Sequence, residues 1–286
     1  MNNLLLTGAS GFVGDYFLSK YSKSYNITTF SFQQSSLDLL ELGNIEVIVH
    51  LSALVHQMGG ASKEAYERVN VEQTLELAKR AKKSSVKHFI FMSSVKVYGE
   101  ESQEVYSEST LCHPKDEYGR SKLKAEIELQ KLEDSEFKVS IIRTPIVYGY
   151  EVKANIKNLI ALVDKVKILP FGDINNKRSM VYIGNLCHLI DRLVIANRSG
   201  IYLANDDVTL STFSFISMIA DELKKNVLIV KIPFFSKLLK TIKPSFYKRL
   251  YMSLEVDNTH TKEVLKMNNL YTIEEGIHNM IHGELV

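Results

Sequence analysis

The sequence has little of several features that would define a protein's environment at once. Its two cysteines, Cys112 and Cys187, are too few for a disulfide framework or a cysteine metal cluster, so we expect a reduced, cytoplasmic protein without a metal. No apolar run approaches the roughly 20 residues that cross a bilayer, so no transmembrane segment is expected. The run at residues 4–6 is too short for a signal peptide. The net charge of +2 gives no reason to expect a nucleic-acid partner.

Internal repeats and low-complexity segments are also absent, which leaves an ordinary globular chain. Its 286 residues are 45% hydrophobic and 24% charged, which is typical of a folded domain. A chain of this length buries about three quarters of its unfolded surface. It therefore suits one large α/β domain, or a core with a smaller lobe.

Glycines cluster near the N-terminus, where a strand is expected to pass into a helix. Gly8, Gly11 and Gly14 follow an apolar run at residues 4–6 and precede or open an amphipathic stretch at residues 13–18. Such a turn lets the backbone approach a pyrophosphate, whose oxygens then face the helix N–H groups. Further candidate cofactor contacts lie in the same turn: Ser10, Phe12 and Val13. A glycine turn in an ordinary strand–helix unit is the alternative, and the flanking elements favour the dinucleotide site.

Expected strands and helices alternate from this turn to Gly149. The strands are rich in β-branched and aromatic residues and lie at residues 27–32, 47–51, 88–92 and 139–143. The longest helices between them are expected at residues 65–83 and 114–132. This alternation predicts an α/β fold with a Rossmann-like, doubly wound parallel sheet. We therefore assign residues 1–149 to a dinucleotide-binding domain.

The alternation changes after Gly149. We expect a helix at residues 154–165, a short strand at 167–171, a strand and a helix over 180–196, and a strand at 200–205. The remainder is mostly helical. Residues 150–286 are thus expected to form mainly a smaller C-terminal substrate-binding lobe, with segments near 179–205 packing back onto the first domain.

The end of the second expected strand would meet the adenosine half of a dinucleotide. NAD-binding proteins usually carry an acid there, about 20 residues beyond the glycine turn. Here Ser31 occupies the strand end, followed by Phe32 and Gln33. With neither an acid nor an arginine in this loop, both NAD and NADP stay open as cofactors. Asp38 and Leu39 are expected in a loop toward the adenine, with a solvated aspartate as the alternative.

The end of the third expected strand offers further cofactor contacts. Leu51, Ser52 and Ala53 lie at the edge where ligands of open α/β sheets collect. Asn70 interrupts the buried face of the next helix, and its amide needs partners there. It would contact the cofactor or tie down neighbouring backbone. His56 is expected to be a surface histidine, with a role in a substrate pocket as the alternative.

The order and spacing of these residues resemble the extended short-chain dehydrogenase/reductase superfamily. The pattern consists of Thr7-Gly8-x-x-Gly11-x-x-Gly14, Asn70, Ser93-Ser94 and Tyr118-x-x-x-Lys122. Residues 50–56, 93–100 and 176–186 look like the NAD-dependent epimerase/dehydratase family. Within it, they resemble the bacterial UDP-sugar 4-epimerase and 4-keto reductase group of O-antigen and capsule biosynthesis. The resemblance covers nearly the whole chain and thins between residues 226 and 251.

The resemblance implies roles for particular side chains. Tyr118 would be the general acid or base, Ser94 would hydrogen-bond the reacting sugar oxygen, and Lys122 would hold the nicotinamide ribose. An adjacent ammonium and the nicotinamide charge would lower the pKa of Tyr118 from its usual value near 10. The substrate contacts implied are Ser94, Lys96, Asn155, Arg178 and Arg249. Arg178 suits a diphosphate because a guanidinium binds two oxygens at once.

Two kinds of function fit these residues. The first is an NAD(P)-dependent enzyme that acts at C4 of a UDP-hexose. We favour reduction of a UDP-4-keto-6-deoxy-N-acetylhexosamine for surface polysaccharide, because Ser31 replaces the acid that selects NAD. A 4-epimerase of UDP-glucose or UDP-N-acetylglucosamine with tightly bound NAD is the alternative. The second kind is a non-catalytic dinucleotide-binding regulator, against which the presence of Ser94, Tyr118 and Lys122 argues. A homodimer is left open.

One stretch is not accounted for by these functions. Residues 234–249 mix Phe, Leu and Ile with Lys237, Lys240, Lys243, Lys248 and Arg249. A helix lying in a membrane interface has this composition. Pro244 would break such a helix, so we favour an ordinary amphipathic helix of the lobe.

Overall fold

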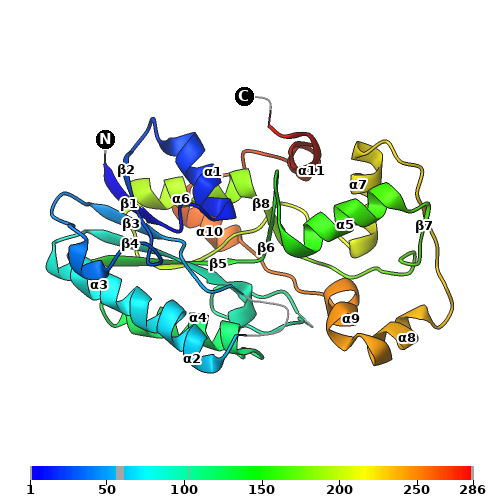
Figure 1. Cartoon of the computed structure of the whole chain (residues 1–286), viewed down its shortest axis with the longest axis horizontal. Helices are drawn as coiled ribbons and strands as arrows, with labels where there is room; N and C mark the ends of the chain where they lie inside the picture. Colours follow the sequence, from blue (N-terminus) through cyan, green and yellow to red (C-terminus); the bar gives the residue numbers. More distant parts are fainter. Residues whose placement is uncertain (1, 56–60, 103, 285–286) are drawn as a thin grey trace.

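The computed structural model describes residues 2–55, 61–102 and 104–284, so His56 lies outside the described residues. Its centre is a sheet of six parallel strands in the order β2-β1-β3-β4-β5-β9 (Figure 1). These strands are β1 Asn3–Thr7, β2 Asn26–Phe30, β3 Val47–His50, β4 His88–Ser94, β5 Lys138–Thr144 and β9 Gly200–Leu203. The order of winding reverses between β1 and β3, and ligands of open α/β sheets bind at such a switch point. The predicted Rossmann-like, doubly wound sheet is confirmed.

Helices cover both faces of this sheet, which explains why its central strands β1 and β3 are almost entirely apolar and buried. Figure 1 shows α2, α3 and α4 on one face and α1, α6 and α10 on the other. Their bounds are α1 Phe12–Tyr21, α2 Lys63–Tyr66, α3 Gln73–Lys83, α4 Glu117–Gln130, α6 Ile183–Ala196 and α10 Thr259–Leu265. Within β1, Leu4 and Leu6 belong to one core cluster and Leu5 to the other, and all three are fully buried.

Three short helical segments interrupt the regular elements. They are the 3₁₀ turns η1 Leu37–Leu39 and η3 Val95–Val97, and the π-helical segment η2 Glu67–Glu72 between α2 and α3. The sequence predicted one continuous helix over residues 65–83, so the π segment is a difference from that prediction. Single π turns within helices often occur at functional sites, and Asn70 lies in this one.

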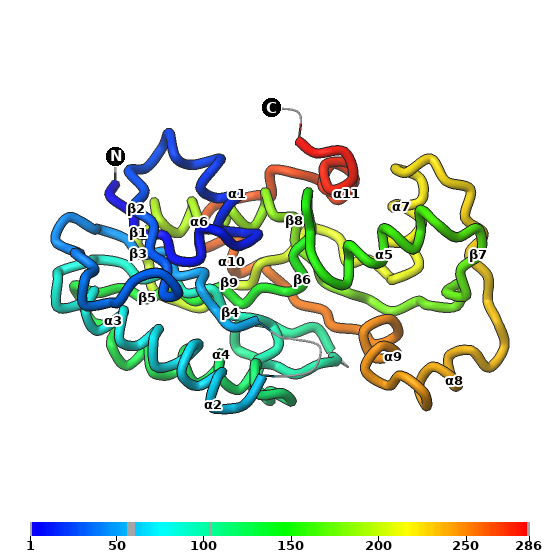
Figure 2. The backbone as a smooth tube through the Cα atoms, in the orientation of Figure 1, coloured from blue at the N-terminus to red at the C-terminus, as the bar shows by residue number. Residues whose placement is uncertain are grey.

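A second, smaller group of elements lies beyond the carboxyl edge of the sheet (Figure 1). Its elements are α5 Ala154–Lys165, β7 Ile168–Leu169, α7 Thr212–Glu222, β10 Leu228–Ile229, α8 Phe235–Ile242 and α9 Pro244–Tyr251. Between this lobe and the sheet, β6 Ile146–Tyr148 pairs with β8 Met180–Tyr182. The tube in Figure 2 shows that the chain enters the lobe after β6, returns through α6 and β9, and enters it again at α7. Pro244 separates α8 from α9, as predicted.

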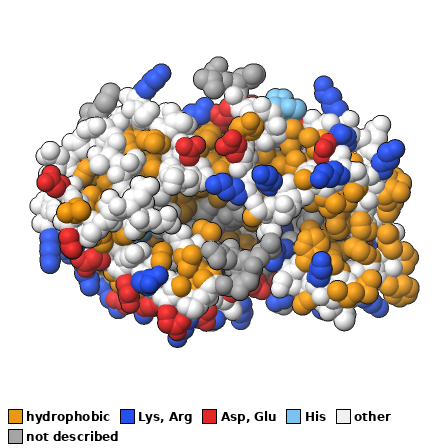
Figure 3. Space-filling model, viewed as in Figure 1, with side chains coloured by type: hydrophobic (Ala, Val, Ile, Leu, Met, Phe, Trp, Pro, Cys, Tyr) orange, Lys and Arg blue, Asp and Glu red, His pale blue; other side chains and the backbone are white. Residues whose placement is uncertain are grey.

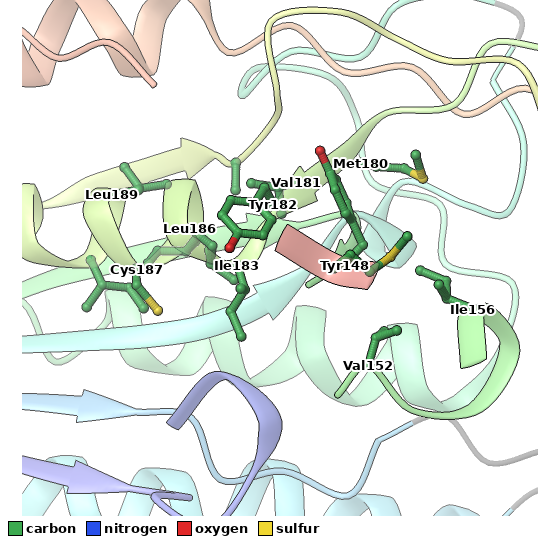
Figure 4. Packing of buried hydrophobic residues seen from close by; sticks show 14 of the residues in the cluster. Tyr148, Val152, Ile156, Met180, Val181, Tyr182, Ile183, Leu186, Cys187 and Leu189 are labelled. Carbon is green, nitrogen blue, oxygen red and sulfur yellow. The ribbon is translucent and has the colours of Figure 1, made fainter. Parts of the chain in front are cut away.

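The lobe and the sheet share one hydrophobic core. Figure 4 shows part of it, with Tyr148, Val152 and Ile156 meeting residues of β8 and α6. The rings of Tyr148 and Tyr182 lie 5.7 Å apart between centroids. The hydroxyl of Tyr148 donates to Asp206 Oδ2 at 2.7 Å, so this buried phenol is not left unpaired. None of the described helices is long and apolar enough to cross a membrane.

The last helix, α11 Ile273–His282, begins with a reciprocal cap. Thr272 Oγ1 accepts from Glu275 N at 3.2 Å, and Glu275 Oε2 accepts from Thr272 N at 2.8 Å. We expect Thr272→Ala to lower the free energy of unfolding by about 1 kcal/mol, because it removes one side of this cap. Urea denaturation measures the change. Thr241→Ala, which removes an exposed hydroxyl that donates to Lys237 O, should change stability less, and equal losses would contradict the capping role.

Candidate active site

The glycine turn after β1 has a shape that only glycine permits at two positions. Gly8 has a φ of +73°, and a Cβ there would lie 2.8 Å from Ser52 N. A Cβ on Gly14 would lie 2.2 Å from Gly8 O. Gly11 is the N-cap of α1 and has no side chain to cap it, so the amides of the first turn face outward. This arrangement suits a pyrophosphate at the helix N-terminus, with Ser10, Phe12 and Val13 in the same turn.

The adenosine side of the switch point carries an unexpected ion pair. Ser31 lies just beyond β2 and is half-buried, with Gln33 after it. Asp38, in η1, is exposed and pairs with Arg80 of α3, which lowers the pKa of Asp38. Leu39 is also exposed. The loop after β2 has no arginine of its own, but Arg80 reaches this side of the site from α3. Both Asp38 and Glu76 form ion pairs with Arg80.

Asn70 holds the loop after β3 in place. Its Oδ1 accepts from Leu54 N at 2.8 Å, and its Nδ2 donates to Leu54 O and to Ser121 Oγ at 3.0 Å each. Both amide hydrogens are thus used inside the protein, and Asn70 joins this loop to α4. Of the two roles considered, the geometry favours positioning of the backbone over direct cofactor contact. Ser52 N, in the same loop, donates to Thr7 Oγ1 at 3.2 Å.

The carboxyl end of β4 meets the start of α4 at two hydroxyl groups. Asp116 caps α4 by accepting from Gly119 N at 2.7 Å, and this cap fixes Tyr118 in the first turn. Ser94 is the last residue of β4 and forms a side-chain hydrogen bond with Tyr118. Burial raises the pKa of Tyr118 to about 12, and the Ser94 bond opposes that rise. In the protein alone, burial thus has the larger effect on the pKa of Tyr118. The expected lowering depends also on the nicotinamide charge and stays a prediction for the complex with the cofactor.

Lys122 lies one helical turn after Tyr118 and is buried. Its Nζ donates to Met92 O at 2.7 Å and lies 4.4 Å from the centroid of the Phe91 ring. Burial lowers the pKa of Lys122 to about 7, opposed by Glu126. A buried amine with one carbonyl partner has donors left for a ligand hydroxyl, as expected of a ribose contact.

A cavity of about 400 Å³ brings the predicted substrate residues together. Every predicted substrate contact lines this cavity, as does the predicted acid–base residue Tyr118. These residues come from five separate parts of the chain: Ser94, Lys96, Tyr118, Asn155, Arg178 and Arg249. Arg249 Nη1 donates to Asn155 Oδ1 at 3.3 Å. The cavity thus has a pair of hydroxyl groups in one part and two guanidinium groups in another.

Arg178 has no carboxylate partner among the described residues. Its backbone is held from both sides, because Arg178 N donates to Leu210 O at 2.9 Å and Ser179 N donates to Leu254 O at 2.9 Å. Its Nη1 donates to Met252 O at 2.9 Å. Among the described residues no acceptor meets its buried Nε, and burial lowers its pKa to about 10. A buried guanidinium without a carboxylate partner favours binding of an anion.

Lys96 is bound differently from the way the sequence suggested. Its Nζ pairs with Asp116, the cap of α4, and lies 3.9 Å from Glu100. It therefore connects the cavity wall to the helix that carries Tyr118. Lys248 and Ser245 also line the cavity, although neither is among the substrate contacts that the resemblance implies. They lie where the resemblance thins, and the pair of adjacent cations at residues 248 and 249 was the signal available.

The switch-point glycine turn and the tyrosine–lysine pair beside a cavity are the features of an extended short-chain dehydrogenase/reductase. A model of the NAD dependent epimerase/dehydratase family matches residues 4–203. The chain belongs to this family.

Individual relatives are epimerases by name. A UDP-glucose 4-epimerase of Vibrio cholerae is 36% identical, over 96% of this chain and 93% of its own. A second relative, from Escherichia coli O157:H7, is the N-acetyl-alpha-D-glucosaminyl-diphospho-ditrans,octacis-undecaprenol 4-epimerase. It is 28% identical to this chain, over 82% of this chain and 76% of its own length. The structure of a UDP-glucuronic acid 4-epimerase from Bacillus cereus in complex with NAD shares the fold. Its TM-score is 0.78 at 19% identity, with 98% of both chains covered.

Proposed function

We propose that this enzyme reduces a UDP-4-keto-6-deoxy-N-acetylhexosamine at C4, using NADPH or NADH, in the synthesis of a surface polysaccharide. The observation that carries the proposal is the composition of the cavity. Ser94 and Tyr118 offer hydroxyl groups for a sugar oxygen, and Arg178 offers a buried guanidinium for a diphosphate. A nucleoside-diphosphate sugar has both groups in one molecule.

The chain's own groups account for the binding and proton-transfer parts of this reaction. Arg178, with Asn155 and Arg249, would hold the diphosphate and so set the position of the sugar. Ser94 would donate to the C4 oxygen, and Tyr118 would give it a proton as negative charge develops there. Lys122 would hold the ribose next to the nicotinamide. A bound NADPH or NADH supplies the hydride.

One feature of the sequence supports reduction over epimerisation. Ser31 occupies the place of the acid that selects and anchors NAD, and this favours a cofactor that exchanges after each turnover. The Vibrio cholerae relative favours the second candidate, a UDP-sugar 4-epimerase that keeps NAD bound.

The identity of Ser31 predicts dual cofactor use. We expect NADPH to serve at least as well as NADH, because Ser31 adds no negative charge that would repel a 2′-phosphate. Ser31→Asp should reverse this preference in favour of NADH. Initial rates with each cofactor on the 4-keto sugar measure both effects. Ser109→Asp, which adds the same charge at an exposed position elsewhere, should leave the ratio unchanged, and a strict NADH requirement of the wild type would contradict the proposal.

A further inference from the structure

The far part of the lobe carries a strong local excess of positive charge. No Asp or Glu occurs between Glu222 and Glu255. The cations in this interval are Lys224, Lys225, Lys231, Lys237, Lys240, Lys243, Lys248 and Arg249. All the lysines among them are exposed. The whole chain has a net charge of only +2, so this segment differs sharply from the rest of the surface.

Large apolar side chains are exposed among these lysines. Leu238 and Ile242 are 57% and 64% exposed, and their spacing of four residues places them on one stripe of α8. Phe234, the residue that precedes the helix, is 76% exposed. Phe235 and Leu239, on the neighbouring stripe, pack against the core. The helix thus uses one apolar stripe for folding and leaves a second one in solvent.

The exposed apolar area extends beyond α8. Ile168 and Leu228 lie opposite each other in the β7–β10 pair, and both are exposed. We define the apolar patch as Ile168, Leu228, Ile232, Phe234, Leu238, Ile242 and Phe246. Figure 3 shows hydrophobic side chains gathered at the end of the molecule where Figure 1 places β7, α8 and α9, with Lys and Arg side chains around them. Exposed apolar areas with a polar border mark interaction surfaces.

We propose that the apolar patch and its lysines seat this protein on the surface of an anionic lipid bilayer. A helix with apolar residues on one side and lysines beside them lies in the plane of a bilayer interface. Anionic headgroups complement the acid-free lysine segment. A second copy of this chain fits less well, because a symmetric contact would place the same lysines against each other. The sequence prediction that favoured an ordinary lobe helix did not foresee this exposed stripe.

The position of the patch connects it to the active site. A second cavity, of about 670 Å³, is lined near the patch by Lys243, Pro244 and Phe246. It shares Asn155, Arg178 and Arg249 with the first cavity. A docked bilayer would therefore lie near the second cavity, which adjoins at Arg178 the cavity that contains Tyr118. Docking itself requires no turnover, so the inference can be tested independently of the proposed reaction.

Vesicle sedimentation tests the docking. The full-length protein is mixed at low salt with vesicles of phosphatidylcholine, or of phosphatidylcholine and phosphatidylglycerol in equal parts. We expect the protein to sediment with the anionic vesicles only, and to be released as salt rises. Lys237→Ser/Lys240→Ser should lower the partition coefficient about 25-fold, at roughly fivefold per lysine. Leu238→Ser/Ile242→Ser should lower it comparably. Both double variants should keep the wild-type Tm and rate on a soluble substrate.

Matched variants separate docking from other effects. Lys79→Ser/Lys83→Ser removes the same charge from exposed positions of α3 and should bind vesicles like the wild type, as should Tyr118→Phe. The proposal is overturned if the wild type stays in the supernatant with anionic vesicles, or if the α3 variant loses as much binding as the patch variants. Formation of a dimer in vesicle-free sedimentation, lost in Leu238→Ser/Ile242→Ser but without any vesicle binding, would assign the patch to self-association instead.

Discussion

Tyr118→Phe is expected to lose about 10²–10⁴-fold in kcat, which is the usual contribution of one positioned acid–base group. The variant keeps the ring, which packs 6.1 Å from the Tyr66 ring between centroids, and loses only the hydroxyl that Ser94 bonds. Binding of dinucleotide and of UDP-sugar should therefore stay close to wild type. Steady-state rates on the 4-keto sugar, with fluorescence titration of NADPH on the same preparation, measure both quantities.

Tyr66→Phe is a matched control for this prediction. Tyr66 is buried beside Tyr118, and its hydroxyl donates a hydrogen bond to Val55 O at a distance of 3.5 Å. Removing that hydroxyl should change kcat far less than removing the hydroxyl of Tyr118. If Tyr118→Phe turns over at nearly the wild-type rate, Tyr118 is not the proton donor.

Arg178→Ala is expected to raise the apparent KM for the UDP-sugar by about 10- to 100-fold, the usual contribution of hydrogen bonds to a charged group. The reason is that Arg178 is a buried cation in the cavity without a carboxylate partner among the described residues. The affinity for the dinucleotide should change much less, because no residue of the glycine turn lines the cavity that contains Arg178. Initial rates over a range of sugar concentrations, with cofactor titration alongside, separate the two effects.

Arg178→Lys tests whether shape or charge matters at this position. Lysine keeps the positive charge but lacks the planar fork that binds two oxygens, so we expect an intermediate KM. Arg120→Ala is the control, since Arg120 lies outside the cavity and pairs with Glu117 at 2.6 Å on the surface. A loss confined to cofactor binding in Arg178→Ala would show that Arg178 serves a different ligand.

Much of the fold could be predicted from local pattern. The helix at residues 154–165 was predicted with the bounds that α5 has, because its apolar spacing and flanking residues agree. Pro145 ends β5 at Thr144, as expected of a residue that cannot donate to the ladder. The expected strand at residues 27–32 ends earlier, at Phe30, so Ser31 already belongs to the loop. The expected strand at 167–171 is reduced to Ile168 and Leu169.

The features that the sequence could not predict depend on contacts between distant residues. Arg80 reaches Asp38 from 42 positions away, and no local pattern links them. The raised pKa of Tyr118 follows from burial, which depends on the complete fold. The meeting of Asn155, Arg178 and Arg249 in one cavity was implied by family resemblance and not by spacing. The exposed stripe of α8 and the stripe that packs on the core are both made of large apolar residues. Only the packing of Phe235 and Leu239 against the core shows which stripe is buried.

Transfer of a labelled hydride tests the proposed reaction most directly. The enzyme is supplied with a UDP-4-keto-6-deoxy-N-acetylhexosamine and NADPH that carries deuterium at the reactive carbon of the nicotinamide, on either face in separate reactions. The product is analysed by NMR, and a parallel tube holds the enzyme with UDP-glucose or UDP-N-acetylglucosamine and no added cofactor. We predict that one labelled NADPH places deuterium at C4 of the product in equal amount to the NADPH consumed, while the parallel tube stays unchanged. An unlabelled 4-keto sugar, together with a C4 epimer and tightly bound NAD in the parallel tube, would contradict the reductase and identify an epimerase.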